Sequence, residues 1–140
     1  MNSKAILGVF LIVTALLTGF ASLPPISATF VSLAGRWKND DVNTHDWAEL
    51  LITYYNPGGD YVLQLWGTCG STECSSVNVA QLYVGNSIGQ ATMVGSFATR
   101  QFTLTLESAN ALTMVTHTHY TDNSGRTDYT ISDNFYRVPT

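Results

Sequence analysis

The stretch RQFTLTLESANALTMVTHTHY, residues 100–120, carries the strongest fold signal in the chain. Apolar side chains occupy every second position from Phe102 to Leu106, and polar side chains fill the positions between them. This alternation predicts a strand with one dry face and one wet face. The turn residues Ser108-Ala109-Asn110 separate it from a second run, Leu112 to Tyr120. So short a connection favours antiparallel pairing, and the stretch therefore predicts a β-hairpin.

Runs of the same kind continue on both sides of this hairpin. Six further strands are predicted over residues 33–38, 47–55, 61–66, 77–84, 90–97 and 127–138. Turn residues separate them, most clearly Asn56-Pro57-Gly58-Gly59-Asp60. Eight strands joined by short loops predict an all-β domain, an antiparallel up-and-down barrel whose closure removes unpaired sheet edges. A β-sandwich, which also uses short alternating strands, is the alternative.

The first 28 residues have the pattern of a signal peptide. Lys4 provides a positive charge, an apolar run follows from Ala5 to Ala21, and Ile26-Ser27-Ala28 offers a cleavage sequence after two prolines. The alternative is an uncleaved anchor, but the run is short for a membrane span and the prolines have no purpose there. We therefore expect one β-barrel domain, residues 29–140, in a secreted or periplasmic location.

The charge of this domain limits its partners. Without Lys4, five basic residues stand against ten acidic ones, so the net charge is about −5. There is no basic patch, which disfavours binding to nucleic acid or, after signal cleavage, to a membrane.

Cys69 and Cys74 are the only cysteines in the chain. In an exported protein, a close pair is typical of a disulfide, here one that closes the loop around Gly70-Ser71-Thr72-Glu73. The alternatives are a metal site, which needs further ligands at suitable spacing, and a redox pair, which usually has the spacing Cys-x-x-Cys.

Both ends of the domain resemble a known family. The stretch LAGRWKND, residues 33–40, contains a Gly-x-Trp similar to the signature of the calycins, which include the lipocalins and avidins, and together with DNFYR, residues 133–137, it resembles the avidins. The resemblance implies an eight-stranded barrel in which Trp37 plugs the closed end and packs against Arg137. The tryptophans of the avidin pocket have no counterparts in the second half of this chain, so biotin binding is not implied.

A second resemblance covers WGTCGSTEC, residues 66–74, which is similar to a stretch of small exported bacterial proteins of no settled function. It implies nothing about activity.

The candidate ligand-binding residues are aromatic, with one acid. They are Trp47, Tyr54, Tyr61, Tyr83, Tyr129 and Asp133, expected in the barrel interior or at its mouth. Aromatic side chains that line a barrel form an apolar cup with polar groups for orientation. Asp133 shares strand parity with Tyr129, so an inward carboxyl could also act as an acid; pairing with Arg137 or capping of the strand end is its commoner role.

Two groups of residues are weaker metal candidates. His117 and His119 project from one face of a strand, but the alternation with Leu112 and Met114 places them outward, as ordinary polar residues. A second group, in the loop between the first two strands, consists of Asp40, Asp41, His45 and Asp46. Its spacing does not match a calcium loop, and a solvated loop is the ordinary interpretation. No cofactor is expected.

These observations predict an exported, non-enzymatic protein that holds a small apolar or amphipathic ligand in a β-barrel. No Gly-x-Ser-x-Gly elbow is present, and paired cysteines offer no thiolate, so no catalytic residue is nominated. The alternative function is a secreted protein-interaction module, such as an inhibitor of an extracellular hydrolase. A homo-oligomer is a further alternative, because strands 47–55 and 77–84 are apolar on both faces.

Overall fold

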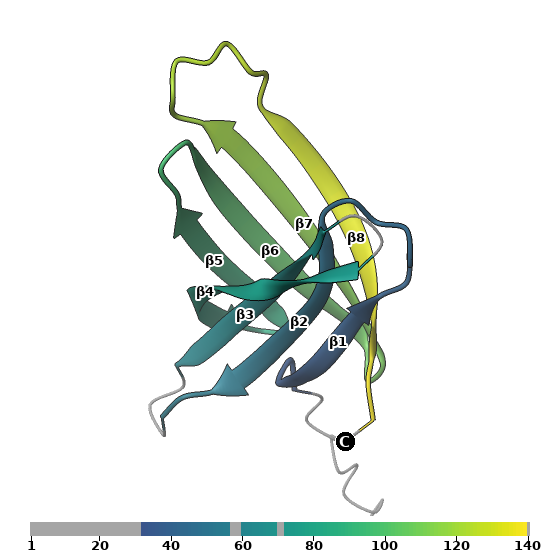
Figure 1. Cartoon of the computed structure of the whole chain (residues 1–140). Coiled ribbons are helices and arrows are strands. Elements are labelled where there is room, and N and C mark those ends of the chain that lie inside the picture. The colour runs from purple at the N-terminus through teal and green to yellow at the C-terminus, as the bar shows by residue number, and fades with distance from the viewer. Residues whose placement is uncertain (1–31, 57–59, 70–71, 140) are drawn as a thin grey trace, which may run out of the picture.

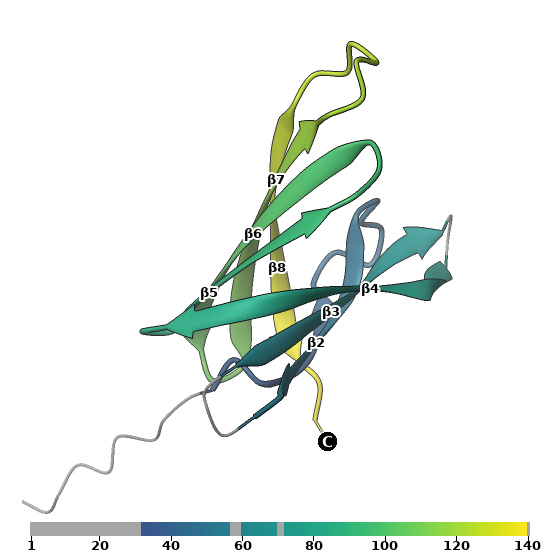
Figure 2. The same cartoon turned by 90° about the vertical axis from the view of Figure 1, so that its left-hand side faces the viewer.

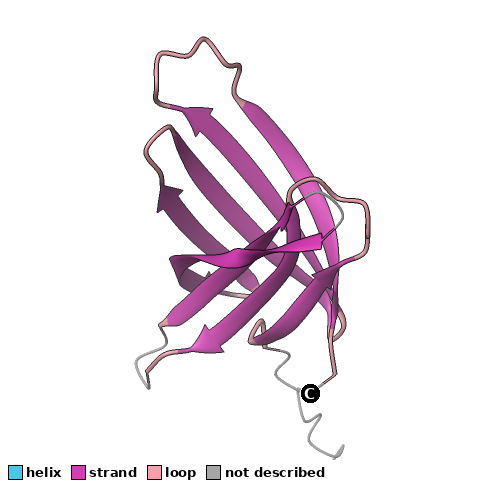
Figure 3. Ribbon diagram, in the orientation of Figure 1, coloured by secondary structure: helices cyan, strands magenta, loops and turns pink. Residues whose placement is uncertain are grey.

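The computed structural model describes residues 32–56, 60–69 and 72–139; for residues 69 and 72–76 it describes the backbone alone. The predicted signal peptide, residues 1–28, lies outside the described residues. The described chain consists of strands and loops (Figure 1 and Figure 3). The strands are β1 (Gly35–Asn39), β2 (Trp47–Tyr54), β3 (Tyr61–Cys69), β4 (Thr72–Gly85), β5 (Ile88–Val94), β6 (Ala98–Ser108), β7 (Ala111–Tyr120) and β8 (Tyr129–Arg137).

The eight strands form a closed barrel in chain order, and every neighbouring pair is antiparallel. This confirms the predicted up-and-down barrel and excludes the sandwich. Successive strands run in opposite directions, so the connections alternate between the two ends. The β1–β2, β3–β4, β5–β6 and β7–β8 connections lie at one end, which we call the mouth. The β7–β8 hairpin projects farthest from the body of the barrel (Figure 2).

The strand boundaries differ from the prediction mainly at the mouth. The last strand begins at Tyr129 rather than at residue 127, because residues 121–128 form a long connecting loop. The fourth strand begins at Thr72, earlier than the predicted residue 77, and pairs with β3 as far as Cys69. Polar residues in this extension hid it from a pattern based on apolar alternation.

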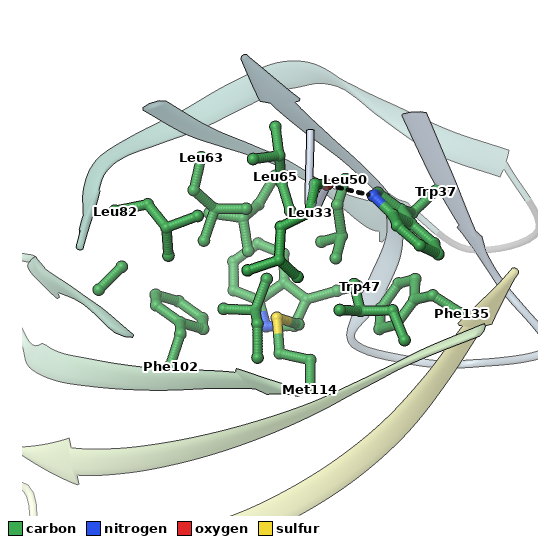
Figure 4. Packing of buried hydrophobic residues seen from close by; sticks show 14 of the residues in the cluster. Leu33, Trp37, Trp47, Leu50, Leu63, Leu65, Leu82, Phe102, Met114 and Phe135 are labelled. Atoms are coloured by element: carbon green, nitrogen blue, oxygen red, sulfur yellow. Dashed lines mark hydrogen bonds between the residues drawn. The ribbon is translucent and has the colours of Figure 1, made fainter. Parts of the chain in front are cut away.

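We call the end opposite the mouth, where β1 begins and β8 ends, the closed end. Apolar side chains fill the barrel interior at the closed end and in the middle. Trp37, Leu50, Leu63, Leu65, Leu82, Leu104, Leu112, Met114 and Phe135 have at most 1% of their surface exposed. Figure 4 shows several of them, among them Leu63, Leu65, Met114 and Phe135, pointing into the barrel from opposite walls. At the limit of this core towards the mouth, Trp47 packs edge to face on Phe102, with ring centroids 5.8 Å apart.

Trp37 and Arg137 pack against each other at the closed end. The Trp37 indole donates a hydrogen bond to the carbonyl of Leu33 at 3.0 Å, and the Arg137 guanidinium carbon lies 4.1 Å from the centre of the Trp37 ring. Gly35 has φ +141°, and a side chain there would collide with Arg137 Nη1, so glycine is required at this position. This is the packing that the family resemblance implies.

No helix among the described residues is long and apolar enough to cross a membrane.

Candidate ligand-binding site

The site lies at the edge of the apolar core, around Trp47 and Phe102. Here the inward positions of four strands carry polar side chains. They are Asn39 on β1, Arg100 on β6, Thr116 and Thr118 on β7, and Asp133 on β8. Thr116 and Thr118 follow Met114 at every second position, so the pleat turns all three to the same inner face.

Asn39 fixes the orientation of the acid. Its side-chain amide donates to the carbonyl of Trp47 at 2.8 Å and to Asp133 Oδ1 at 3.1 Å, and its oxygen accepts from the backbone N–H of Asp41 at 2.8 Å. The amide nitrogen has two hydrogens, and both are used. Asn39 therefore ties the β1–β2 loop to the interior and holds Asp133 in one orientation.

The other oxygen of Asp133, Oδ2, is buried and has no hydrogen-bond partner in the described part of the chain. Burial raises the pKa of this carboxyl; the hydrogen bond from Asn39 opposes that effect, and the nearby charges of Asp46 and Asp41 add to it. A carboxyl in this state can accept a hydrogen bond from a donor that enters the barrel, and when protonated it can donate one.

Two threonine hydroxyls are also buried without a partner. Thr116 and Thr118 are 1% and 0% exposed, and neither Oγ1 makes a hydrogen bond within the described residues. Leaving such a group unsatisfied costs about 1–3 kcal/mol, and a valine of nearly the same shape would avoid that cost. The hydroxyls therefore do not serve the apolar core. Together with Asp133 Oδ2 they provide three unused polar atoms in the barrel interior.

The predicted aromatic residues divide between the two ends of the barrel. Trp47 lies next to the polar groups, since its carbonyl accepts from Asn39, and Tyr129 is near the mouth, where its ring centre is 6.2 Å from that of Tyr120. Tyr54 and Tyr61 contact each other edge to face at 5.1 Å, but they flank the β2–β3 connection at the opposite end.

For Tyr83 the predicted placement is wrong. Its side chain is 64% exposed on the outer face of β4, because its neighbour Leu82 faces inward. Tyr54, with 52% exposed, is also not part of the mouth. Of the six predicted residues, the structure brings Trp47, Tyr129 and Asp133 to the mouth half of the barrel and leaves Tyr54, Tyr61 and Tyr83 away from it.

Both histidines of β7 are exposed on the outer face. His119 Nδ1 donates to Asp128 Oδ2 at 2.6 Å, and this hydrogen bond is the main reason why the pKa of Asp128 is lowered. His117 Nδ1 lies 2.9 Å from Thr130 Oγ1. Across the described residues, no three side chains of His, Cys, Asp or Glu are close enough to hold a metal ion.

The acidic β1–β2 loop has the hydrogen bonds of a self-capped turn. The Asp41 carboxylate accepts from the N–H of Asn43 at 2.9 Å, and Asp40 and His45 are exposed. Asp46 contributes its backbone carbonyl to the N–H of Thr68 at 3.0 Å. The predicted disulfide of Cys69 and Cys74 involves side chains outside the described set.

A separate hollow lies on the β7–β8 loop. It measures about 750 Å³, is lined by residues 119–128, and is open to solvent. A hollow formed by a single exposed loop offers a ligand little enclosure, whereas the interior groups are buried or half-buried and come from four strands. We therefore identify the interior groups as the candidate site.

The sequence prediction missed Asn39, Arg100, Thr116 and Thr118. The sequence does carry a signal for the two threonines, because the alternation that turns Met114 inward continues through both of them. Asn39 and Arg100 carry no comparable signal, because their roles depend on which strands the barrel closure brings together.

Comparison with known proteins bears on the fold. No protein-family model and no curated protein matches the chain. Among solved structures, the chain is similar to the crystal structure of a rhizavidin–biotin complex, with a TM-score of 0.54 and 17% sequence identity. The match covers 78% of this chain and 94% of the rhizavidin chain. At this identity the likeness concerns the fold alone, and the chain therefore has the fold of an avidin-type, calycin-like barrel.

Proposed function

We propose that this protein is a non-enzymatic binding protein that holds one small molecule in the mouth half of its barrel. The observation that carries the proposal is the set of three buried polar atoms without partners, on Thr116, Thr118 and Asp133. A ligand with hydrogen-bonding groups would satisfy these atoms and recover their desolvation cost. The solved rhizavidin–biotin complex supports the general idea that a barrel of this fold takes a small molecule.

The ligand would be amphipathic. Trp47 and Phe102 supply apolar surface, and the polar atoms lie beside them on β7 and β8, where Thr116 is the cross-strand partner of Phe102 and Asp133 that of Met114. A molecule with an apolar body and one or two polar groups fits this combination. We also propose that residues 1–28 direct export and that Cys69 and Cys74 form a disulfide, in keeping with a secreted or periplasmic binding protein.

The proposal is tested by native mass spectrometry of the mature protein recovered from an exporting host. We expect a retained small-molecule mass on the wild type and a loss of at least about tenfold in occupancy in the double variant Thr116→Val, Thr118→Val. The variant should fold with equal or greater stability, since valine removes two unsatisfied hydroxyls.

The matched control is Thr103→Val, Thr105→Val, which makes the same change at outward positions of β6. It should keep the full retained mass. A polypeptide mass alone, or equal retention in both double variants, would contradict the proposed function.

The alternative, a protein-interaction module, has one observation in its favour. The outer faces of β4 and β5 expose Val79, Tyr83 and Val94. Sedimentation velocity of the mature protein tests this alternative. A stable dimer that Tyr83→Ser converts to a monomer would favour the protein-interaction module over the small-molecule binding protein.

A further inference from the structure

We infer that the ligand of this barrel carries an anionic group, a carboxylate or similar, and that Arg100 binds that group at the mouth. The inference rests on the proposed function and adds the chemical class of the ligand. It depends on three observations: Arg100 faces the barrel interior, its guanidinium contacts only aromatic rings among the described residues, and the unpaired hydroxyl of Thr118 lies opposite it on β7.

Arg100 is an inward-facing arginine near the mouth end of β6. It shares the parity of Phe102 and Leu104, which are buried in the core, and its own side chain is half-buried. Its guanidinium carbon lies 6.0 Å from the centre of the Trp47 ring and 5.7 Å from that of Phe97. The guanidinium is thus held over the barrel interior between an aromatic floor and an aromatic rim.

Among the described basic side chains, Arg100 is the one whose contacts are confined to aromatic rings. Arg36 and Lys38 face Glu49, Arg126 is paired with Asp122 at 2.5 Å, and Arg137 donates to three backbone carbonyls. These pairings involve the other four basic residues of the described chain. Ring faces do not satisfy the five N–H donors of a guanidinium, which match a carboxylate in two parallel hydrogen bonds.

The hydroxyl of Thr118 faces the same part of the barrel interior as Arg100. Thr118 is the direct cross-strand partner of Arg100, and directly opposed side chains begin about 5 Å apart at Cβ. Its hydroxyl is fully buried and has no partner among the described residues. A guanidinium and an unused hydroxyl on neighbouring strands together form a donor set that suits an anion.

The position of Asp133 relative to Arg100 and Thr118 indicates how the ligand would be oriented in the barrel. Arg100 and Thr118 lie towards the mouth, whereas Asp133 lies beside Met114, two inward positions deeper on the β7–β8 ladder than Thr118. An acid with an apolar body and an N–H or O–H donor at the far end would meet all three. The negative charge of the protein does not prevent this, because charges beyond about 8–10 Å are largely screened at physiological salt.

The test uses two probes that share one ring system. N-phenyl-1-naphthylamine is uncharged, and 8-anilinonaphthalene-1-sulfonate adds a sulfonate to it. Both brighten when they leave water, so fluorescence titration gives their dissociation constants. We expect the wild type to bind the sulfonate about tenfold or more tightly than the neutral probe, and Arg100→Gln to abolish that preference without weakening the neutral probe.

The matched control is Arg126→Gln, which removes the same charge from the rim of the mouth. Arg126 lies 5.1 Å from the Phe97 ring, but its guanidinium is already paired with Asp122. This variant should keep the preference for the sulfonate.

The outcomes separate the inference from the proposed function. Equal binding of the two probes, or a preference that survives Arg100→Gln, would overturn the inference and leave the binding function intact. A failure of the wild type to bind either probe would contradict the proposed function and the inference with it.

Discussion

At the scale of one residue, the barrel changes the pKa and the hydrogen bonding of the Asp133 carboxyl. It stands in an inward position that an apolar residue would fill in a purely structural strand. Asn39 holds one of its oxygens, and burial raises its pKa above the ordinary value. The fold therefore tolerates this carboxyl at some cost, which supports the binding role proposed for it above.

The raised pKa has a consequence for stability that the variant Asp133→Asn can reveal. The folded state holds the Asp133 proton more tightly than the unfolded state, whose pKa is about 3.9. The stabilisation from the protonated group is complete below that pH and is lost as pH rises through the higher folded pKa. The free energy of unfolding of Asp133→Asn, relative to the wild type, should therefore increase as pH rises above about 4.

Urea unfolding across this pH range measures the effect. Asp128→Asn is the control of opposite sign, because the pKa of Asp128 is lowered in the folded state. Its stability relative to the wild type should fall as pH rises from acid. A flat profile for Asp133→Asn would show that the carboxyl is solvated in the folded protein.

At this scale the sequence predicted Asp133, Trp47 and Trp37, and the family resemblance implied Arg137 as the partner of Trp37, but the contacts of Asp133 and Trp47 were not predicted. Strand parity places a side chain inside or outside, and it succeeded for Asp133 and for both histidines of β7. It cannot say how far along the barrel axis a residue lies, which is why Tyr54 and Tyr61 were grouped with residues of the other end. The contacts of Asn39 and Arg100 arise only when β1 meets β8 and β6 faces Trp47.

At the scale of elements, the hairpins set the register of the barrel. β4 and β5 are joined by Asn86 and Ser87, with φ of 50° and 68°, and Gly85 pairs directly with Ile88. Two successive residues of positive φ in a two-residue loop define a type I′ turn, which matches the twist of the strands. The sequence indicated a turn at this place, but the strain at Ser87 follows only from the backbone.

Ser87→Gly should therefore stabilise the protein. Left-handed backbone costs an ordinary residue about 1–2 kcal/mol, and glycine avoids this at a smaller cost in unfolded-state entropy, so a net gain of about 0.5–1 kcal/mol is expected. The carbonyl of Ser87, which accepts from the N–H of Leu106 at 3.0 Å, is kept in the variant. Thermal unfolding would register an increase of a few degrees.

Ser96→Gly provides the comparison, since Ser96 lies in the β5–β6 connection without positive φ. Glycine there should leave stability unchanged or slightly lower. An equal gain at both positions would mean that Ser87 is not strained.

At the scale of the whole molecule, the barrel depends on one short seam. β1 is the shortest strand, and it meets β8 over three residue pairs, from Trp37 with Arg137 to Asn39 with Phe135. The sequence predicted the eight strands because each is a short run of strand-forming residues bounded by turn residues. Closure joins the first strand to the last, and it was inferred from the need to remove edges and from the family resemblance.

Arg137 reinforces this seam from three directions. Its guanidinium donates to the carbonyls of Ser32 and Ala34 at 2.6 Å and its Nε to that of Ala109 at 2.7 Å, so it joins β8 to the segment before β1 and to the β6–β7 turn. The same group covers the Trp37 ring. Burial lowers its pKa, but an arginine remains charged at any physiological pH.

Arg137→Met should therefore weaken the whole barrel. It removes three charge-assisted hydrogen bonds and leaves their carbonyl acceptors to find water, for an expected loss of about 2–4 kcal/mol in the free energy of unfolding. Arg126→Met, which breaks an exposed ion pair on the β7–β8 loop, should cost less than about 1 kcal/mol.

Hydrogen exchange in Arg137→Met should accelerate first in β1 and β8, because the seam opens before the long hairpins do. A loss of protection spread evenly over all eight strands would instead mean that the barrel opens as one unit and that the seam is not its weakest join.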